Sequence, residues 1–292
     1  CFMHQEHNRK ESNMNCAESC PLSGLKKVLL ATDGSQFSEG ATREAIKFAK
    51  QCSSKVYAMS VVEILTDYEA FSPQRIEEVR DSEAKKHLES VQARAMNEKV
   101  DCEIIIAHGD PHSEIVDAAA AKHVDMVVIG RRGKTGLKKL LMGEVATKVI
   151  GHAPCRVLVV PRASKIEFKK LLVATDGSKH SEQAIAEAVG IAKCCGSNLI
   201  ILSAMRDESE QKEAQTNVSK AAEIAQKEGV NVETLTPVGR SYDVIVETAG
   251  GRGVDLIVMG TYGKTGIKKM LMGSSTEKVI GHAGCAVLVV RS

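Results

Sequence analysis

Apolar residues along this chain are concentrated in ten short runs. The runs are rich in Val, Ile and Leu and are continuous rather than alternating with polar residues. Continuous runs of this length predict β-strands that are buried on both faces, as in a parallel sheet covered by helices. The predicted strands are 27–32, 55–62, 102–107, 125–129 and 156–160 in the first half, and 169–175, 198–204, 231–236, 255–259 and 286–290 in the second.

The segments between these runs have the spacing of amphipathic helices. In 181–195 and 207–228, for example, apolar residues recur every three or four positions. Alternation of strands and helices predicts the α/β class, with doubly wound domains and right-handed crossovers. Such a sheet leaves space for a ligand at the carboxyl ends of its strands, where the strand order reverses.

The two halves of the chain repeat each other. KVLLATD at 27–33 matches KLLVATD at 170–176, and KVIGHAPCRVLVV at 148–160 matches KVIGHAGCAVLVV at 278–290. The first copy is longer, and its additional residues fall around 64–74. The repeat predicts a flexible tail over 1–25, one domain over 26–161, a short linker, and a second domain over 169–292.

A glycine and hydroxyl motif follows the fourth strand of the second copy. It has the form G-x2-G-x9-G-S-S-T and consists of Gly260, Gly263, Gly273, Ser274, Ser275 and Thr276. Glycines let a ligand approach the backbone, and Ser274 is a good N-cap for the helix that follows. A helix start with free N–H groups and hydroxyls predicts an anion site, although glycines can also simply turn a strand into a helix.

Two nucleotide motifs are excluded by spacing. A Walker A loop ending at Gly263-Lys264-Thr265 would need a glycine where Val258 stands. No G-x-G-x-x-G fingerprint follows the first strand of either copy. The loop therefore belongs to neither a P-loop NTPase nor a classical dinucleotide-binding domain.

The first copy keeps the glycines but loses the hydroxyls. Gly130, Gly133 and Gly143 remain, whereas Glu144 begins the segment that replaces Ser-Ser-Thr. A carboxylate at a helix start complements the helix dipole and repels a triphosphate. We expect a degenerate, structural site here, in which the neighbouring Arg131 and Arg132 pair with Glu144; the alternative is that these arginines assist phosphate binding.

Taken together, these motifs resemble a tandem universal stress protein of the ATP-binding subgroup. The resemblance rests on V-A-T-D-G-S after the first strand, the glycine loop, and the closing C-x-V-L-V-V strand. It implies a five-stranded parallel sheet of order 3-2-1-4-5 in each domain. It also implies that strands 156–160 and 286–290 pair within the chain to form a pseudo-dimer, and that two chains can pair further.

The resemblance also implies an adenine-nucleotide site in the second domain. Thr175 and Asp176 would meet adenine and ribose, the main chain of Ala204 would contact adenine, and Met259 and Gly260 would flank the ribose. Gly263, Gly273, Ser274, Ser275 and Thr276 would hold the phosphates, with Mg²⁺ or Mn²⁺ bound mainly by phosphate oxygens. The degenerate equivalent comprises Asp33, Gly130, Gly133, Gly143 and Glu144. A purely local role, capping the Asp-Gly-Ser turn, is the alternative for Asp33 and Asp176.

Composition narrows the function without identifying it. The net charge is +2, aromatic residues make up 3% and Trp is absent. These values argue against nucleic-acid or membrane-surface binding and against base-stacking platforms. No apolar run approaches the length of a membrane span. Nine scattered cysteines indicate reduced thiols and a cytoplasmic location, with adjacent Cys194 and Cys195 unpaired.

Two further features have a structural and a functional interpretation. His4, His7, Cys16 and Cys20 could bind a soft metal, but a disordered polar tail is favoured. His152 and His282 recur at helix ends, where a histidine interacts with the helix dipole rather than serving catalysis.

The favoured function is a stress-response sensor or adaptor that binds ATP, ADP or AMP in its second domain and acts on an unidentified protein partner. A slow ATPase or autophosphorylating enzyme is one alternative, and a ligand-free interaction module is another. Binding is preferred because the phosphate loop lacks an evident carboxylate to activate water.

Overall fold

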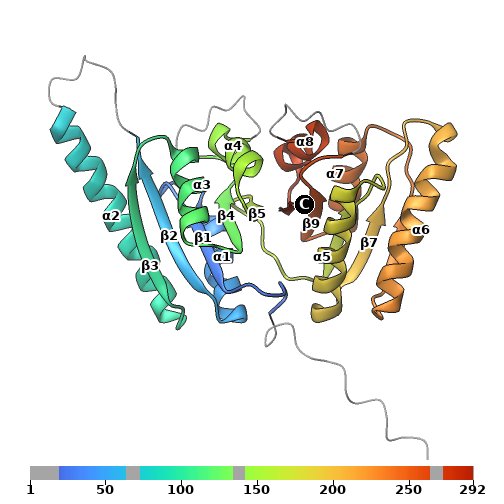
Figure 1. The fold of residues 1–292 in the computed structure, drawn as a ribbon, viewed down its shortest axis with the longest axis horizontal. Helices are drawn as coiled ribbons and strands as arrows, with labels where there is room; N and C mark the ends of the chain where they lie inside the picture. Colours follow the sequence, from blue (N-terminus) through green and yellow to red (C-terminus); the bar gives the residue numbers. More distant parts are fainter. Residues whose placement is uncertain (1–19, 64–72, 134–141, 264–271, 292) are drawn as a thin grey trace, which may run out of the picture.

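The fold is built around one continuous sheet of ten strands. A computed structural model describes residues 20–63, 73–133, 142–263 and 272–291. The strand order is β3-β2-β1-β4-β5-β10-β9-β6-β7-β8, so each half has the predicted order 3-2-1-4-5 (Figure 1). The strands are β1 (Lys27–Ala31), β2 (Lys55–Val62), β3 (Cys102–His108), β4 (Met126–Gly130), β5 (Arg156–Val160), β6 (Lys170–Ala174), β7 (Asn198–Leu202), β8 (Val232–Leu235), β9 (Leu256–Gly260) and β10 (Ala286–Val290).

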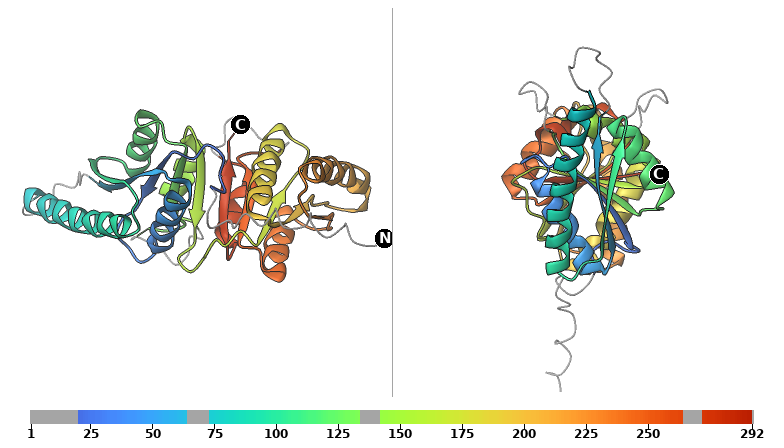
Figure 2. Two further views of the ribbon diagram at one scale, coloured as in Figure 1. Left: turned by 90° about the horizontal axis from the view of Figure 1, so that it is seen from below. Right: turned by 90° about the vertical axis from the view of Figure 1, so that its left-hand side faces the viewer.

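Helices cover both faces of the sheet (Figure 2). One core contains residues of α1, α2, α5 and α6, and the other contains residues of α3, α4, α7 and α8. The helices are α1 (Glu39–Cys52), α2 (Pro73–Asn97), α3 (Pro111–Ala121), α4 (Glu144–His152), α5 (Lys179–Cys195), the short η1 (Glu208–Glu210), α6 (Gln211–Lys227), α7 (Ser241–Arg252) and α8 (Ser274–His282). None of the helices in this described part of the chain combines the length and apolar character that a bilayer crossing requires.

The two copies differ most between their second and third strands. Helix α2 has 25 residues and its counterpart α6 has 17. Part of the additional length of the first copy therefore lies in this helix. Residues 64–72, the centre of the predicted insertion, lie outside the described residues.

The closing strands of the two copies join the halves, as the resemblance implied. β5 and β10 pair antiparallel, with Leu158 opposite Leu288. The other strand pairs of the described sheet are parallel. Each closing strand thereby gains a hydrogen-bonded neighbour, so neither becomes an exposed edge.

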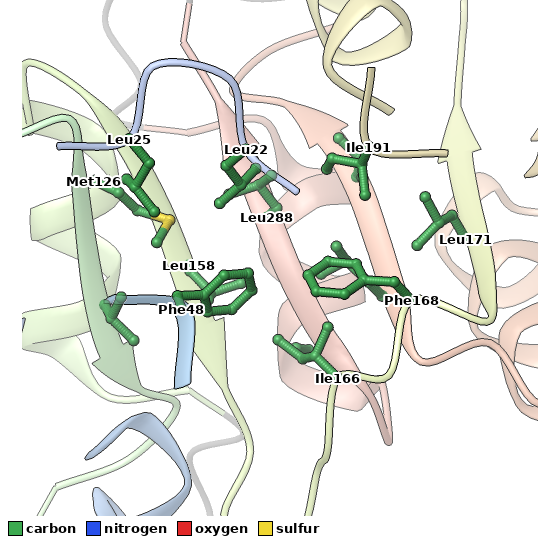
Figure 3. Close-up of a cluster of buried hydrophobic side chains, with 14 of the residues drawn as sticks. Leu22, Leu25, Phe48, Met126, Leu158, Ile166, Phe168, Leu171, Ile191 and Leu288 are labelled. Atoms are coloured by element: carbon green, nitrogen blue, oxygen red, sulfur yellow. The ribbon is translucent and has the colours of Figure 1, made fainter. Parts of the chain in front are cut away.

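Side chains of the linker and of the N-terminal segment pack against this junction (Figure 3). The rings of Phe48 on α1 and Phe168 in the linker meet edge to face, with centroids 5.4 Å apart. Ile166 and Leu22 are also fully buried in the same cluster. Leu22 belongs to the predicted tail, so the part of that tail that the structure describes packs against the domains.

Two arginines reinforce the junction by capping helices across it. Arg131, directly after β4, donates from Nη1 to Ala283 O at 2.7 Å, at the carboxyl end of α8. Arg291, directly after β10, donates from Nη1 to Ala153 O at 2.5 Å, at the carboxyl end of α4. A cation at a helix carboxyl end satisfies orphan carbonyls and complements the helix dipole. Each half therefore caps a helix of the other.

The prediction of reduced thiols is wrong for three cysteines. Cys20 and Cys52, at the end of α1, form a disulfide. Cys195, at the equivalent end of α5, is also disulfide-bonded. Cysteine spacing cannot reveal such pairings, because they depend on how the N-terminal segment packs. Because three cysteines are disulfide-bonded, the cysteines no longer support the predicted cytoplasmic location.

Other cysteines agree with the expectation of buried thiols. Cys102, Cys155 and Cys285 are not disulfide-bonded. Burial raises the pKa of Cys155 to about 11 and that of Cys285 to about 12. Thiolates are the reactive form, so these side chains are protected at neutral pH.

Loss of the Cys20–Cys52 disulfide should destabilise the first domain. The bond closes a loop between residues 32 positions apart, which the chain-entropy relation equates with about 3.7 kcal/mol of unfolding free energy. Cys20→Ser should lower the denaturant midpoint accordingly. The Cys20→Ser/Cys52→Ser double variant should lose little more, because either single change already removes the bond. Alkylation of both thiols in the unreduced protein would contradict this pairing.

Removal of either cross-domain cap should weaken the junction. Arg131→Ala and Arg291→Ala should each lower the free energy of unfolding by about 1–2 kcal/mol, because helix-end carbonyls lose a charged donor. Arg252→Ala is the control, since its ion pair with Glu233 lies within the second domain and is about half exposed; we expect a loss below about 1 kcal/mol there. Equal losses in all three variants would show that the caps contribute nothing particular.

Candidate functional site

A cavity opens at the carboxyl ends of the strands of the second domain. Its volume is about 730 Å³, within the range of small-molecule sites. All ten residues predicted from the sequence line it: Thr175, Asp176, Ala204, Met259, Gly260, Gly263, Gly273, Ser274, Ser275 and Thr276. The fold thus brings together residues from four separate segments, and their individual binding roles stay predictions.

The floor of the cavity is formed where β6 and β7 end. Thr175 N donates to Leu202 O at 2.9 Å, and the buried Thr175 hydroxyl lies 3.1 Å from that of Ser181. Ser203 N donates to Leu235 O at the end of β8, and Met205 N donates to Pro237 O just after it. Because peptide groups alternate in direction along a strand, the main chain of Ala204 is turned away from β8. This orientation is the one that a main-chain contact with a ligand requires.

The two carboxylate oxygens of Asp176 have different surroundings: one caps its own turn and the other faces the glycine loop. Its Oδ1 accepts from Ser178 N at 3.0 Å, which confirms the turn-capping interpretation. Its Oδ2 faces the glycine loop, because a methyl group on Gly263 would come within 2.5 Å of it. A side chain at position 263 would therefore displace the Asp176 carboxylate or the loop. Asp33 repeats the turn-capping bond in the first domain, to Ser35 N at 3.0 Å.

Two other features tighten the loop around its glycines. A methyl group on Gly260 would lie 2.7 Å from His180 O, so only glycine fits at the end of β9. Gly273 N donates to Thr261 O at 3.0 Å and closes the loop onto its own start. Residues 264–271 between these points, including Lys264 and Thr265, lie outside the described residues.

The helix predicted to form the anion site starts one residue earlier than expected. Gly273 is the N-cap of α8, and Ser274 is its first helical residue rather than the cap. The buried Thr276 hydroxyl donates to Gly260 O at 3.1 Å, so its proton is already committed to the fold. Ser274 is exposed and Ser275 half-buried. The two serines are thus the better-placed hydroxyl donors for a phosphate.

The first domain has a cavity in the matching position. Its volume is about 910 Å³, and its lining includes the whole predicted degenerate set of Asp33, Gly130, Gly133, Gly143 and Glu144. His87 of α2 enters this cavity and its Nε2 lies 2.9 Å from Thr32 Oγ1. In the second domain Asn217 of α6 lies close to the corresponding turn at Gly177. The first domain therefore has a cavity of comparable size, but the side chains around it differ from those of the second domain.

The expected pairing of Arg131 with Glu144 is wrong. Glu144 Oε1 instead accepts from Lys148 Nζ at 2.7 Å, one turn along α4. Arg131 turns away from the loop to cap α8 of the other domain. The local i,i+4 pair forms because both side chains lie on the same face of one helix. Neither Arg131 nor Glu144 is thus arranged to hold a phosphate.

The histidines at the helix ends are structural, as predicted. His152 Nδ1 lies 2.8 Å from Lys148 O, and His282 Nδ1 lies 2.8 Å from Lys278 O. Each ring therefore satisfies a carbonyl in the last turn of its helix. Cys20, one of the four residues proposed to bind a metal in the N-terminal segment, is in a disulfide and cannot serve as a thiolate ligand. The other three, His4, His7 and Cys16, lie outside the described residues.

Several residues that line this cavity belong to none of the motifs described from the sequence. The lining also contains Ser203, Asn217, Arg240, Tyr242 and Lys278. Arg240, Tyr242 and Lys278 stand where the first copy has Asp110, His112 and Lys148. Comparing the repeats position by position was the signal that could have identified them.

The chain matches one protein family over both halves. A sequence model of the universal stress protein family matches residues 24–161 and 167–291. Universal stress protein MJ0531 of Methanocaldococcus jannaschii is 37% identical over 144 residues, which is 48% of this chain and 84% of that protein. Universal stress protein Slr1230 of Synechocystis is 24% identical over 297 residues, covering 91% of this chain and all of that protein.

Solved structures share the tandem arrangement. A universal stress protein from Archaeoglobus fulgidus superposes with a TM-score of 0.77 at 22% identity, covering 95% of this chain and 98% of that one. At this identity the likeness concerns the fold alone.

The Glu144–Lys148 pair predicts a pH dependence with a definite sign. The hydrogen bond from Lys148 lowers the pKa of Glu144 below its ordinary value of 4.5. Any stabilisation is therefore present above pH 4.5 and is lost as the pH falls through the lowered pKa. Lys148→Gln should return the Glu144 pKa towards 4.5 in an NMR titration, whereas Lys278→Gln should leave it unchanged. An unaltered titration in Lys148→Gln would show that the pair does not form.

Proposed function

The chain belongs to the universal stress protein family, and we propose that it binds one adenine nucleotide per chain, in its second domain, as a regulatory sensor or adaptor. Family membership supports a stress-related nucleotide-binding role in general. The proposal adds the nucleotide, the domain and the stoichiometry. ATP, ADP and AMP share the adenine and ribose contacts, and ATP is the ligand that would use the whole phosphate loop.

One observation carries the proposal. All the loop glycines, the start of α8 and the ends of β6 and β7 line a single cavity. The backbone N–H groups at the start of α8 and the hydroxyls of Ser274 and Ser275 supply donors where phosphates would sit, and the helix dipole favours negative charge there. A closed turn with no ligand would not need this combination.

The chemistry of the first domain supports the proposal that only the second domain binds a nucleotide. Its cavity is the larger of the two, yet a carboxylate replaces Ser274 at the helix start. Repulsion between this carboxylate and a phosphate chain would oppose binding. We therefore assign a structural role to the first domain, including the capping of α8 by Arg131.

A divalent cation would be held through the phosphates. Within the described residues, no group of three or more His, Cys, Asp and Glu side chains could hold a metal ion. Mg²⁺ or Mn²⁺ accompanying the nucleotide would therefore be coordinated by phosphate oxygens and water. Its contribution would be to neutralise phosphate charge.

Calorimetric titration of the full chain with ATP should give one site per chain. Gly263→Ala should weaken binding at least tenfold, because the added methyl group displaces Asp176 or the loop. Gly133→Ala is the matched control, since its methyl group would meet Asp33 Oδ2 at 2.9 Å in the first domain. At about 100-fold excess over Kd, ATP should stabilise the wild type by roughly 2.7 kcal/mol.

Three outcomes would change the conclusion. Two ATP molecules per chain, with equal sensitivity to both alanine variants, would remove the asymmetry. Absence of any ATP, ADP or AMP binding would favour a ligand-free interaction module. Sustained phosphate release that disappears in Gly263→Ala would make the protein an ATPase.

A further inference from the structure

Two cations converge on one aromatic ring at the rim of the second cavity. Arg240 Cζ lies 5.4 Å and Lys278 Nζ 4.8 Å from the centroid of the Tyr242 ring. All three residues line the cavity, together with Ser274 and Ser275. Arg240 immediately precedes α7 and Lys278 lies on α8, so the cluster is assembled from two helices.

Arg240 is held by an ion pair, and its terminal N–H groups point beyond that contact. Arg240 Nε donates to Asp243 Oδ2 at 2.7 Å, which leaves the Nη1 and Nη2 groups for a further acceptor. Lys278 lies against Tyr242 by a cation–π contact. A polyanion bound at this rim would be attracted to both cations. The ring also restricts where both long side chains can go.

The first domain provides an internal comparison at the same positions. Asp110 stands in place of Arg240, Glu144 in place of Ser274, and Lys148 in place of Lys278. Lys148 Nζ reaches Glu144 Oε1 at 2.7 Å, which shows that a lysine here can contact an anion at the helix start. Asp110 caps α3 by accepting from His112 N and Ser113 N. The first rim thus supplies its own anions, whereas the second replaces them with an arginine and a serine.

We propose that Arg240 and Lys278, positioned by Tyr242, form a subsite for the distal phosphates and make the second domain select nucleotides by their number of phosphates. The inference rests on the proposed nucleotide function and deepens it. Adenine and ribose contacts are common to adenosine, AMP, ADP and ATP, so they cannot distinguish among these ligands. Cations at the rim would act mainly on charge that extends past the first phosphate.

Binding of ATP, ADP, AMP and adenosine to Arg240→Gln and Lys278→Gln tests the subsite. Each variant should weaken ATP binding about fivefold and the double variant by at least about tenfold, as expected for partly screened charge pairs. Adenosine and AMP should change less than twofold. Lys148→Gln is the matched control in the first domain and should leave all four affinities unchanged.

A second test introduces into the second domain the carboxylate that the first domain has at the start of its helix. Ser274→Glu should capture Lys278 in an i,i+4 pair, as Glu144 captures Lys148. ATP affinity should fall much more than adenosine affinity, and the salt dependence of ATP binding should become weaker. Circular dichroism and an unchanged adenosine affinity would show that the variant is folded.

The outcomes separate this inference from the function on which it rests. If the wild type binds ATP but the Gln variants lose ATP, AMP and adenosine equally, or lose none of them, the subsite is wrong and the nucleotide site stands. If the wild type binds none of the four ligands, both are wrong. A selective loss of ATP affinity supports both.

Discussion

The antiparallel pairing of β5 with β10 is the interaction on which the rest of the structure depends. Both strands are almost entirely apolar and buried, and an unpaired edge of this kind would be a site of aggregation. Pairing them within the chain satisfies their backbone groups and brings α1 and the linker together over the junction, as the contact of Phe48 with Phe168 shows. The linker then becomes part of the core instead of a flexible tether.

This junction also affects the chemistry of the two cavities. Position 131, the first residue after β4, is an arginine whose side chain crosses to cap α8. At the equivalent position the second copy has Thr261, whose buried hydroxyl bonds Val290 O within its own domain. A cation that the first loop could have offered to a phosphate is thus used to hold the halves together. The asymmetry between the sites therefore includes both a repulsive carboxylate and a redirected arginine.

The backbone could be predicted from the sequence to a much greater extent than the side-chain partners. Apolar runs and the repeat predicted the strands, because these follow from burial and chain direction, whereas the strand order within each half and ten of the residues that line the second cavity followed from the resemblance to the universal stress protein family. The partner of Glu144 was mispredicted because a lysine one helical turn away outcompetes an arginine in a neighbouring loop. The helix start was misplaced by one residue, a common uncertainty at helix ends. The disulfides and the Arg240–Tyr242–Lys278 cluster join segments distant in sequence, which no local pattern reveals.

A repeated fold within one chain separates the contribution of shape from that of charge. The two cavities share their glycines, their strand ends and the start of a short helix, and the first is the larger. Volume and backbone geometry alone therefore cannot explain why only one of them would accept a nucleotide. The differences include the rim positions, where Asp110 and Glu144 face Lys148 in one domain while Arg240 and Lys278 both lie over Tyr242 in the other. In a rim open to solvent each such charge has a modest effect, so selectivity for a polyphosphate requires several of them to act in the same direction. The second domain has that arrangement, and in the first domain the acidic side chains oppose it.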